Sequence, residues 1–136
     1  MKNLKLNYHT LVKNKIVHFV GEIYDELKIC NYIKNASLFV SPGNIGLACI
    51  HSLSYGTPVC THDKMSYQMP EAEALNNLNS VLFKRNNLSS LISSIQKGIK
   101  LSSNEETKIN CVKSISTNYT PEKQKNKIIE YIKSLK

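Results

Sequence analysis

The chain has 136 residues, of which 41% are hydrophobic, and a formal net charge of +8 at pH 7. This length suits one domain with a buried core. No stretch approaches the roughly 18 apolar residues that a membrane-spanning helix needs, and the first residues lack the apolar run of a signal peptide. We therefore expect a cytoplasmic protein.

The positive charge comes almost entirely from lysine, because Arg85 is the single arginine among eighteen basic residues. Proteins that read nucleic acid favour arginine, which bonds bases and phosphates through two N–H groups at once. The lysines are also spread along the chain, with few aromatic residues among them. We interpret them as a solvated surface and do not expect a nucleic acid partner. The alternative is attraction to an anionic substrate or to anionic lipids at the inner face of the membrane.

The four cysteines show no C-x-x-C spacing, and three of them lie in apolar segments: Cys30, Cys49, Cys60 and Cys111. We interpret them as reduced thiols, mostly buried, rather than as metal ligands or disulfide partners. We expect no metal site and no bound cofactor.

Strand and helix patterns alternate along the chain. In order, they predict a helix over 3–13, a strand over 16–20, a helix over 23–35, a strand over 38–41, a helix beginning near Gly46, a strand over 58–62, a short helix over 70–75, a strand over 81–83, and helices over 88–99, 105–116 and 121–135. This alternation predicts an α/β fold in a single domain over residues 1–136. The expected core is a Rossmann-like parallel sheet of about four strands flanked by helices.

Several side chains are expected to be buried in these elements. His18 lies within the first apolar run and is interpreted as a core histidine. The apolar helical faces are expected to contain Leu27, Cys30, Tyr32 and Ile33, then Leu47, Ile50 and Leu53, then Leu88, Leu91, Ile92, Ile95 and Ile99.

The stretch from Ser41 to Thr61 contains the candidate site. A turn, Ser41-Pro42-Gly43-Asn44, leads from a strand into a short helix, which Gly56 is expected to end as a C-cap glycine. Open parallel sheets bind ligands at the carboxyl ends of their strands, where this turn is expected. N–H groups near Ile45-Gly46-Leu47 and the positive end of the helix dipole would together bind an anion, above all a phosphate.

Residues from about 16 to 135 resemble the C-terminal, donor-binding part of GT-B glycosyltransferases of the large family 4 (group 1) type. The similar segments come in the family's order. Val17-His18-Phe19-Val20-Gly21 is similar to the family's V-x-F-x-G, and residues 32–36 are similar to the helix end that follows it. Ser41-Pro42 with Ile45-Gly46-Leu47 is similar to the family's P-S…F-G-L, and residues 51–59 are similar to its E-A-M-A-x-G-T-P-V. Pro70-Glu71 with residues 79–83 is similar to its P-E…n-G-x-L-V.

The resemblance implies transfer of a sugar from a nucleotide-diphosphate donor to an acceptor hydroxyl, in polysaccharide or glycan biosynthesis of the bacterial type. It places the diphosphate at Ile45-Gly46-Leu47 and the base near Gly21-Glu22-Ile23. The family usually carries two glutamates here, one near the donor sugar and its phosphates and one on the ribose. These positions are Gly43 and His51 in this chain. A histidine can still bond a ribose through a ring nitrogen, without the strength of a carboxylate.

No catalytic residue is assigned, and the candidate substrate-binding residues are Gly21, Glu22, Ile23, Gly43, Asn44, Ile45, Gly46, Leu47, His51 and Glu71. Several have a structural alternative. Gly46 would permit close packing of helix and sheet, and Glu22 and His51 would lie on the surface. Glu71 would complement a helix dipole. In the loop after residues 58–62, Tyr67 and Gln68 either contact the donor or are solvated.

The family's acceptor-binding domain, and its basic pair for the diphosphate, lie upstream of the similar part. We therefore expect this chain to transfer no sugar by itself and to need that N-terminal domain or a partner chain. Its last helix, with Ile128, Ile129, Ile132 and Leu135, is expected to be only partly covered and to favour self-association. One alternative is a non-catalytic interaction half-domain that completes or regulates a partner glycosyltransferase chain. A second, less favoured alternative is a Rossmann-like nucleic-acid or lipid-surface binder driven by the lysines.

Overall fold

The computed structural model describes residues 8–135, and its centre is a three-stranded parallel sheet. Strands β1 (Phe39–Ser41), β2 (Val59–His62) and β3 (Ser80–Phe83) lie side by side in the order β1-β2-β3. Strand β2 is buried along its whole length because it has a strand on each edge and helices over both faces. The predicted α/β class with a parallel sheet flanked by helices is confirmed.

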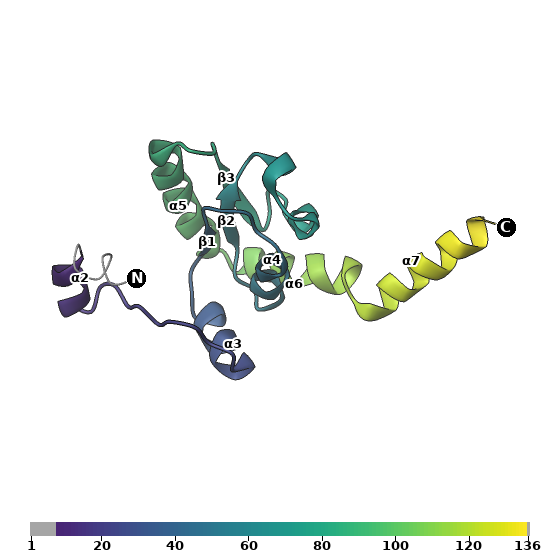
Figure 1. The fold of residues 1–136 in the computed structure, drawn as a ribbon, viewed down its shortest axis with the longest axis horizontal. Helices are drawn as coiled ribbons and strands as arrows, with labels where there is room; N and C mark the ends of the chain where they lie inside the picture. Colours follow the sequence, from purple (N-terminus) through teal and green to yellow (C-terminus); the bar gives the residue numbers. More distant parts are fainter. Residues whose placement is uncertain (1–7, 136) are drawn as a thin grey trace.

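Helices surround this sheet and extend beyond it. Figure 1 shows α5 on one side of the sheet and α4 with α6 on the other, while α2 and α7 lie away from it at opposite ends of the molecule. The remaining bounds are α2 His9–Lys13, α3 Glu26–Lys34, α4 Leu47–Ser54, α5 Leu88–Ser102, α6 Glu105–Asn118 and α7 Pro121–Ser134, with 3-10 helices η1 Met65–Tyr67 and η2 Pro70–Ala74 between β2 and β3. Of the helix predicted over 3–13, residues 3–7 lie outside the described residues.

Local capping chemistry fixes the helix ends. Gly56 follows the C-cap of α4 with φ +80°, a conformation that favours glycine, so the predicted C-cap glycine is confirmed. Asp25 accepts hydrogen bonds from the backbone N–H groups of Leu27 and Lys28. This cap starts α3 at Glu26, three residues later than predicted.

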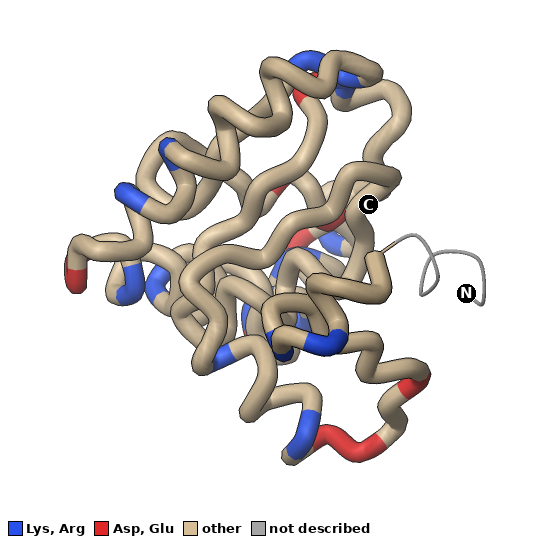
Figure 2. Tube along the Cα trace, turned by 90° about the vertical axis from the view of Figure 1, so that its left-hand side faces the viewer, with Lys and Arg blue, Asp and Glu red and all other residues tan. Residues whose placement is uncertain are grey.

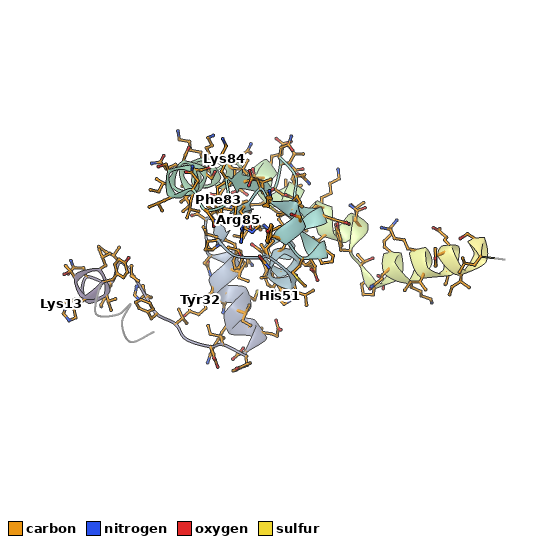
Figure 3. The ribbon with its side chains drawn as sticks, turned by 45° about the horizontal axis from the view of Figure 1, so that its top comes forward. Lys13, Tyr32, His51, Phe83, Lys84 and Arg85 are labelled. Atoms are coloured by element: carbon orange, nitrogen blue, oxygen red, sulfur yellow. The ribbon has the colours of Figure 1, made fainter. Side chains whose placement is uncertain are left out.

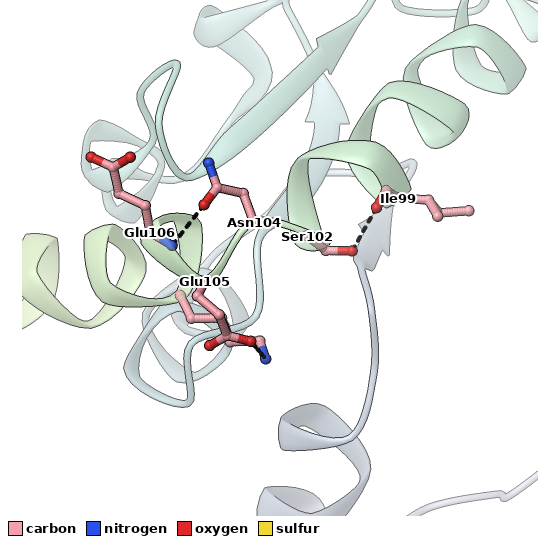
Figure 4. A network of polar contacts seen from close by, with 6 residues as sticks. Ile99, Ser102, Asn104, Glu105 and Glu106 are labelled. Carbon is pink, nitrogen blue, oxygen red and sulfur yellow. Dashed lines mark hydrogen bonds and ion pairs between the residues drawn. The ribbon is translucent and has the colours of Figure 1, made fainter.

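The junction between α5 and α6 is polar (Figure 4). Ser102 Oγ donates to the carbonyl of Ile99 at 2.8 Å in the last turn of α5. Asn104 Oδ1 then accepts the N–H of Glu106 at 2.9 Å and caps α6. These bonds satisfy backbone and side-chain groups where one helix stops and the next begins.

The hydrophobic core lies between α4, α6, η2 and the sheet. Its buried members are Ile45, Cys49, Leu53, Val59, Ala72, Ala74, Cys111 and Ile115. Ile45 belongs to the loop before α4, yet only 1% of it is exposed. The loop that we expect to bind a ligand is therefore anchored in the core.

The strand predicted over residues 16–20 is wrong, so the described sheet has three strands rather than four. Ile16 is 67% exposed, and His18 lies on the surface with its Nε2 donating to the carbonyl of Lys15 at 2.9 Å. An apolar run becomes a strand only where a neighbouring strand accepts its hydrogen bonds. No described segment pairs with the outer edge of β1, and residues 16–20 lie outside the sheet.

The predicted apolar faces are right only in part: Leu53 is buried and Ile50 packs against the core, whereas other members are exposed. Leu27 and Tyr32 of α3 are exposed, as are Leu47 of α4 and Leu88, Ile92 and Ile99 of α5. The buried positions of α5 are Ser94 and Gly98 instead. These small residues bring the α5 backbone close to the sheet and leave the larger apolar side chains at its flanks.

The charged residues are scattered over the trace rather than gathered on one face (Figure 2). Only two ion pairs are found among residues 8–135, Lys28 with Asp25 and Lys108 with Glu105. This distribution agrees with the interpretation of the lysines as a solvated surface. No helix in the described part of the chain combines the length and the apolar character needed to cross a membrane.

All four cysteines are free thiols; Cys49, Cys60 and Cys111 are buried, and Cys30 is partly exposed. Burial raises the pKa of Cys49 from 9.0 to about 12 and that of Cys111 to about 11. Because the thiolate is the reactive form, an alkylating agent at neutral pH should modify Cys30 first, and the others only after unfolding. The two raised pKa values favour the folded state below pH 9, and this contribution should be lost as the pH rises towards 11 and 12. Mass spectrometry of the alkylated protein checks the order of labelling, and equal labelling of all four thiols in the folded protein would contradict that order. Unfolding curves measured against pH check the predicted loss of stability.

Candidate functional site

The candidate site is the loop that joins the carboxyl end of β1 to α4. Residues 42–44 are exposed, Ile45 is anchored in the core, and Gly46 is the N-cap of α4. The glycine provides no capping side chain, so backbone N–H groups at this end need other acceptors. The parallel sheet places the loop at the ligand-binding edge that the sequence predicts.

Three consecutive backbone donors remain open at the start of α4. The first bond that closes the helix runs from the N–H of Cys49 to the carbonyl of Gly46, at 2.8 Å. Within the described residues, the N–H groups of Gly46, Leu47 and Ala48 make no hydrogen bond. Leu47 is 66% exposed, so an outside acceptor can approach this turn.

Ile45 was predicted to contribute an N–H group to the same site, and the structure contradicts this. The N–H of Ile45 donates to Gln68 Oε1 at 2.7 Å. The open donors therefore lie one residue further along the chain than predicted, at Gly46 to Ala48.

Gln68, in the segment after β2, holds the loop in place through hydrogen bonds. Its Nε2 donates to Thr61 Oγ1 at 3.0 Å and to the carbonyl of His62 at 2.9 Å, while Thr61 Oγ1 donates to the carbonyl of Ser41 at 2.9 Å. The N–H of Met69 also donates to the carbonyl of Ile45, at 3.2 Å. Gln68 is thus a structural link between the ends of β1 and β2. The sequence did not reveal this role, because nothing in a polar loop residue shows which distant backbone group it will bond.

His62 is a second buried polar residue at this edge. Only 1% of it is exposed, and its ring meets Phe83 edge to face with centroids 6.3 Å apart. Its Nδ1 lies 3.1 Å from Gln68 Nε2, whose two N–H groups also face Thr61 Oγ1 and the carbonyl of His62. Nε2 of His62 is buried without a hydrogen-bond partner among the described residues.

Glu71, a candidate from the sequence, lies beside the start of α4. A Cβ added to Gly46 would stand 3.9 Å from Glu71 Oε2 and 3.4 Å from Met69 Cγ. This carboxylate oxygen is buried and has no hydrogen-bond partner within residues 8–135. Its negative charge complements the helix dipole, and after burial it is the next cause that raises the pKa of Cys49. Glu71 therefore places an unused acceptor next to three unused donors.

The other candidates are less closely grouped. His51 is partly buried on the second turn of α4 (Figure 3). A Cβ added to Gly43 would meet nothing within 4 Å, so the turn has open space where the similar family carries a glutamate. Asn44 is exposed in the same turn.

Gly21, Glu22 and Ile23 are not brought to this loop. Figure 1 shows the segment that leads into α3 beyond the amino ends of the strands, whereas the loop is at their carboxyl ends. Glu22 Oε2 accepts a local hydrogen bond from the hydroxyl of Tyr24 at 2.9 Å. The described chain therefore gives no support for a base site at these residues.

The candidate site does not coincide with the cavity at the other end of the sheet. A cavity of about 370 Å³ is found at the amino ends of the strands, with Lys34, Tyr55, Gly56 and Lys108 in its wall. It lies at the opposite end of the sheet from Gly46 to Ala48. At the candidate site itself, residues 42–44, Leu47 and Ala48 are exposed at the carboxyl edge of the sheet.

Comparisons of the chain with models of protein families, with curated proteins and with solved structures return no match.

Proposed function

We propose that this chain is the donor-binding half of a glycosyltransferase and that its ligand is a nucleotide-diphosphate sugar. The observation that carries the proposal is the row of open N–H groups at Gly46, Leu47 and Ala48, at the carboxyl end of a parallel strand. Such a row at the positive end of a helix suits a phosphate. The sequence resemblance described above supports the same ligand.

The proposed chemistry is stabilisation of a leaving diphosphate. Negative charge develops on the leaving oxygens as the bond to the sugar breaks, and fixed backbone donors stabilise it without having to reorganise. Glu71 Oε2 would accept a hydroxyl of the donor, because it is buried without a partner beside the same donors. His51 would bond a ribose hydroxyl from α4. Gln68 keeps the loop in place through the N–H of Ile45.

Catalysis would need further residues that face this site from another domain or chain. Strand β1 is an edge strand of the described sheet, and the loop faces no second domain within residues 8–135. Transfer requires that donor and acceptor are held together in one geometry, which one side of a crevice does poorly. We therefore propose that the acceptor and further cations come from an N-terminal domain or a partner chain.

Isothermal titration calorimetry with UDP, GDP and ADP tests the proposal. We expect weak, saturable binding of at least one diphosphate and much weaker binding of uridine, guanosine and adenosine, because the proposed contacts are to the phosphates. A well-folded sample that gives no saturable heat with any diphosphate would contradict the proposal.

A second candidate function is supported by a different observation. The apolar side chains of α7 are exposed, among them Ile128 at 54% and Ile132 at 53%, and β1 has an open edge. Exposed apolar patches and open edges recruit partners. The chain would then complete or regulate a partner glycosyltransferase without binding the donor itself. The same titration separates the two candidates, because this one expects no binding of a nucleoside diphosphate.

A further inference from the structure

The loops that follow β2 and β3 are joined to each other at the carboxyl edge of the sheet. The N–H of Asp63 donates to the carbonyl of Phe83 at 2.9 Å. Asp63 Oδ1 in turn accepts the backbone N–H of Arg85 at 3.2 Å. The pairing of the two strands is thus continued beyond their ends, and Arg85 is held at this edge beside Lys84 (Figure 3).

The turn that carries Arg85 is fixed by further bonds. The N–H of Lys84 donates to Ser90 Oγ at 2.9 Å, and the N–H of Asn87 donates to the carbonyl of Lys84 at 3.1 Å. Asn86 adopts φ +61°, a left-handed conformation that asparagine tolerates better than most residues. The backbone at Arg85 therefore has one defined conformation, and it aims the side chain towards η1.

The guanidinium of Arg85 lies over the ring of Tyr67, with its central carbon 4.2 Å from the ring centroid. Stacking of this kind holds the planar group by one face and leaves its N–H edge free. Among the described residues, no hydrogen bond or ion pair is found for this guanidinium; Asp63 bonds the backbone of Arg85, not its side chain. A positioned fork of donors therefore has no acceptor within the described chain.

The surrounding charge is positive. Lys64 follows Asp63 and Lys84 precedes Arg85, which gives three positive charges against one negative charge in the two joined loops. Residues 74–104 contain no acidic residue at all. Neither Lys64 nor Lys84 forms an ion pair in the part of the chain that the structure describes.

From these observations we infer that Arg85, stacked on Tyr67 and supported by Lys64 and Lys84, forms a second anion site that takes a phosphate group. A guanidinium fork matches two oxygens of a phosphate, and the lysines add charge. This site is distinct from the open N–H groups of α4. The end of β3 is two strand spacings from the end of β1, about 10 Å, because neighbouring strands lie about 4.8 Å apart. The inference goes beyond the proposed donor function and does not depend on it.

The test is an NMR titration of backbone amides with inorganic phosphate, at constant ionic strength kept by sodium chloride. We expect saturable shifts at Tyr67 and at residues 84–87. Arg85→Gln should weaken this binding at least fivefold, and Arg85→Lys should weaken it less, since charge remains and the fork is lost. Tyr67→Phe should bind nearly as the native chain does, because the ring that holds the guanidinium remains.

Lys97→Gln is the matched control, because it also removes one positive charge, from an exposed position of α5. It should leave phosphate binding unchanged. Every variant at position 85 keeps the backbone N–H that bonds Asp63, so the turn should survive, and the amide spectrum shows whether it does. Three results would overturn the inference: no saturable shift at residues 84–87, equal weakening by Arg85→Gln and Lys97→Gln, or shifts confined to Gly46, Leu47 and Ala48. The last result would assign the phosphate to the α4 site alone, and it would leave the proposed donor function intact.

Discussion

Replacement of Leu47 by proline is expected to weaken the binding of a nucleoside diphosphate while α4 stays folded. Leu47 is the first residue of α4, and its N–H is one of the three open donors. Proline lacks this N–H but suits the first position of a helix, where its fixed φ is already correct. A hydrogen bond to a charged group contributes about 1.5–3 kcal/mol, so the loss should be roughly tenfold to a hundredfold in affinity.

Leu47→Ala is the matched control for this variant. It removes the same exposed side chain and keeps the N–H, so it should bind the diphosphate as the native chain does. Calorimetry gives the affinities, and circular dichroism shows that both variants keep their helical content. Native affinity of the proline variant would exclude this N–H as a phosphate donor. Equal loss in both variants would assign the effect to the leucine side chain.

The second large effect is expected in the packing of α5 on the sheet. A Cβ added to Gly98 would stand 2.7 Å from both Cδ atoms of Leu38 and 3.1 Å from Val81 Cγ2. Gly98→Val adds this atom and two methyl groups in a space that is already filled. Overpacking of this kind costs about 1–3 kcal/mol, more than the few tenths of a kcal/mol that replacing glycine gains in helix propensity.

Urea unfolding measures the effect, with Lys97→Val as the control. Position 97 is the neighbouring, exposed position of α5, so valine there changes helix propensity without entering the core. We expect a clearly lower midpoint for Gly98→Val and little change for the control. Equal midpoints would mean that the flexible end of Leu38 moves aside, and that close contact with the sheet is not what requires a glycine.

Part of the candidate site could be predicted from the sequence. The turn after β1, the helix start near Gly46 and the C-cap at Gly56 were all predicted correctly, because each depends on the local conformational preference of one or two residues. The assignment of the Ile45 N–H was wrong, because its acceptor, Gln68, is 23 residues away. Nothing near Ile45 in the sequence announces that bond.

The sequence by itself determined the α/β class, the C-cap glycine at Gly56 and the position of the loop between β1 and α4. These features follow from hydrophobic periodicity and from short-range capping bonds, which act within a few residues. Only the tertiary structure decided which patterns were used. Residues 16–20 have the composition of a strand, but a strand forms only where another strand pairs with it, and β1 has no such partner on its outer edge within the described residues. In the same way, the placement of Glu71 beside Gly46 and of Arg85 over Tyr67 depends on contacts between distant segments, which no local pattern contains.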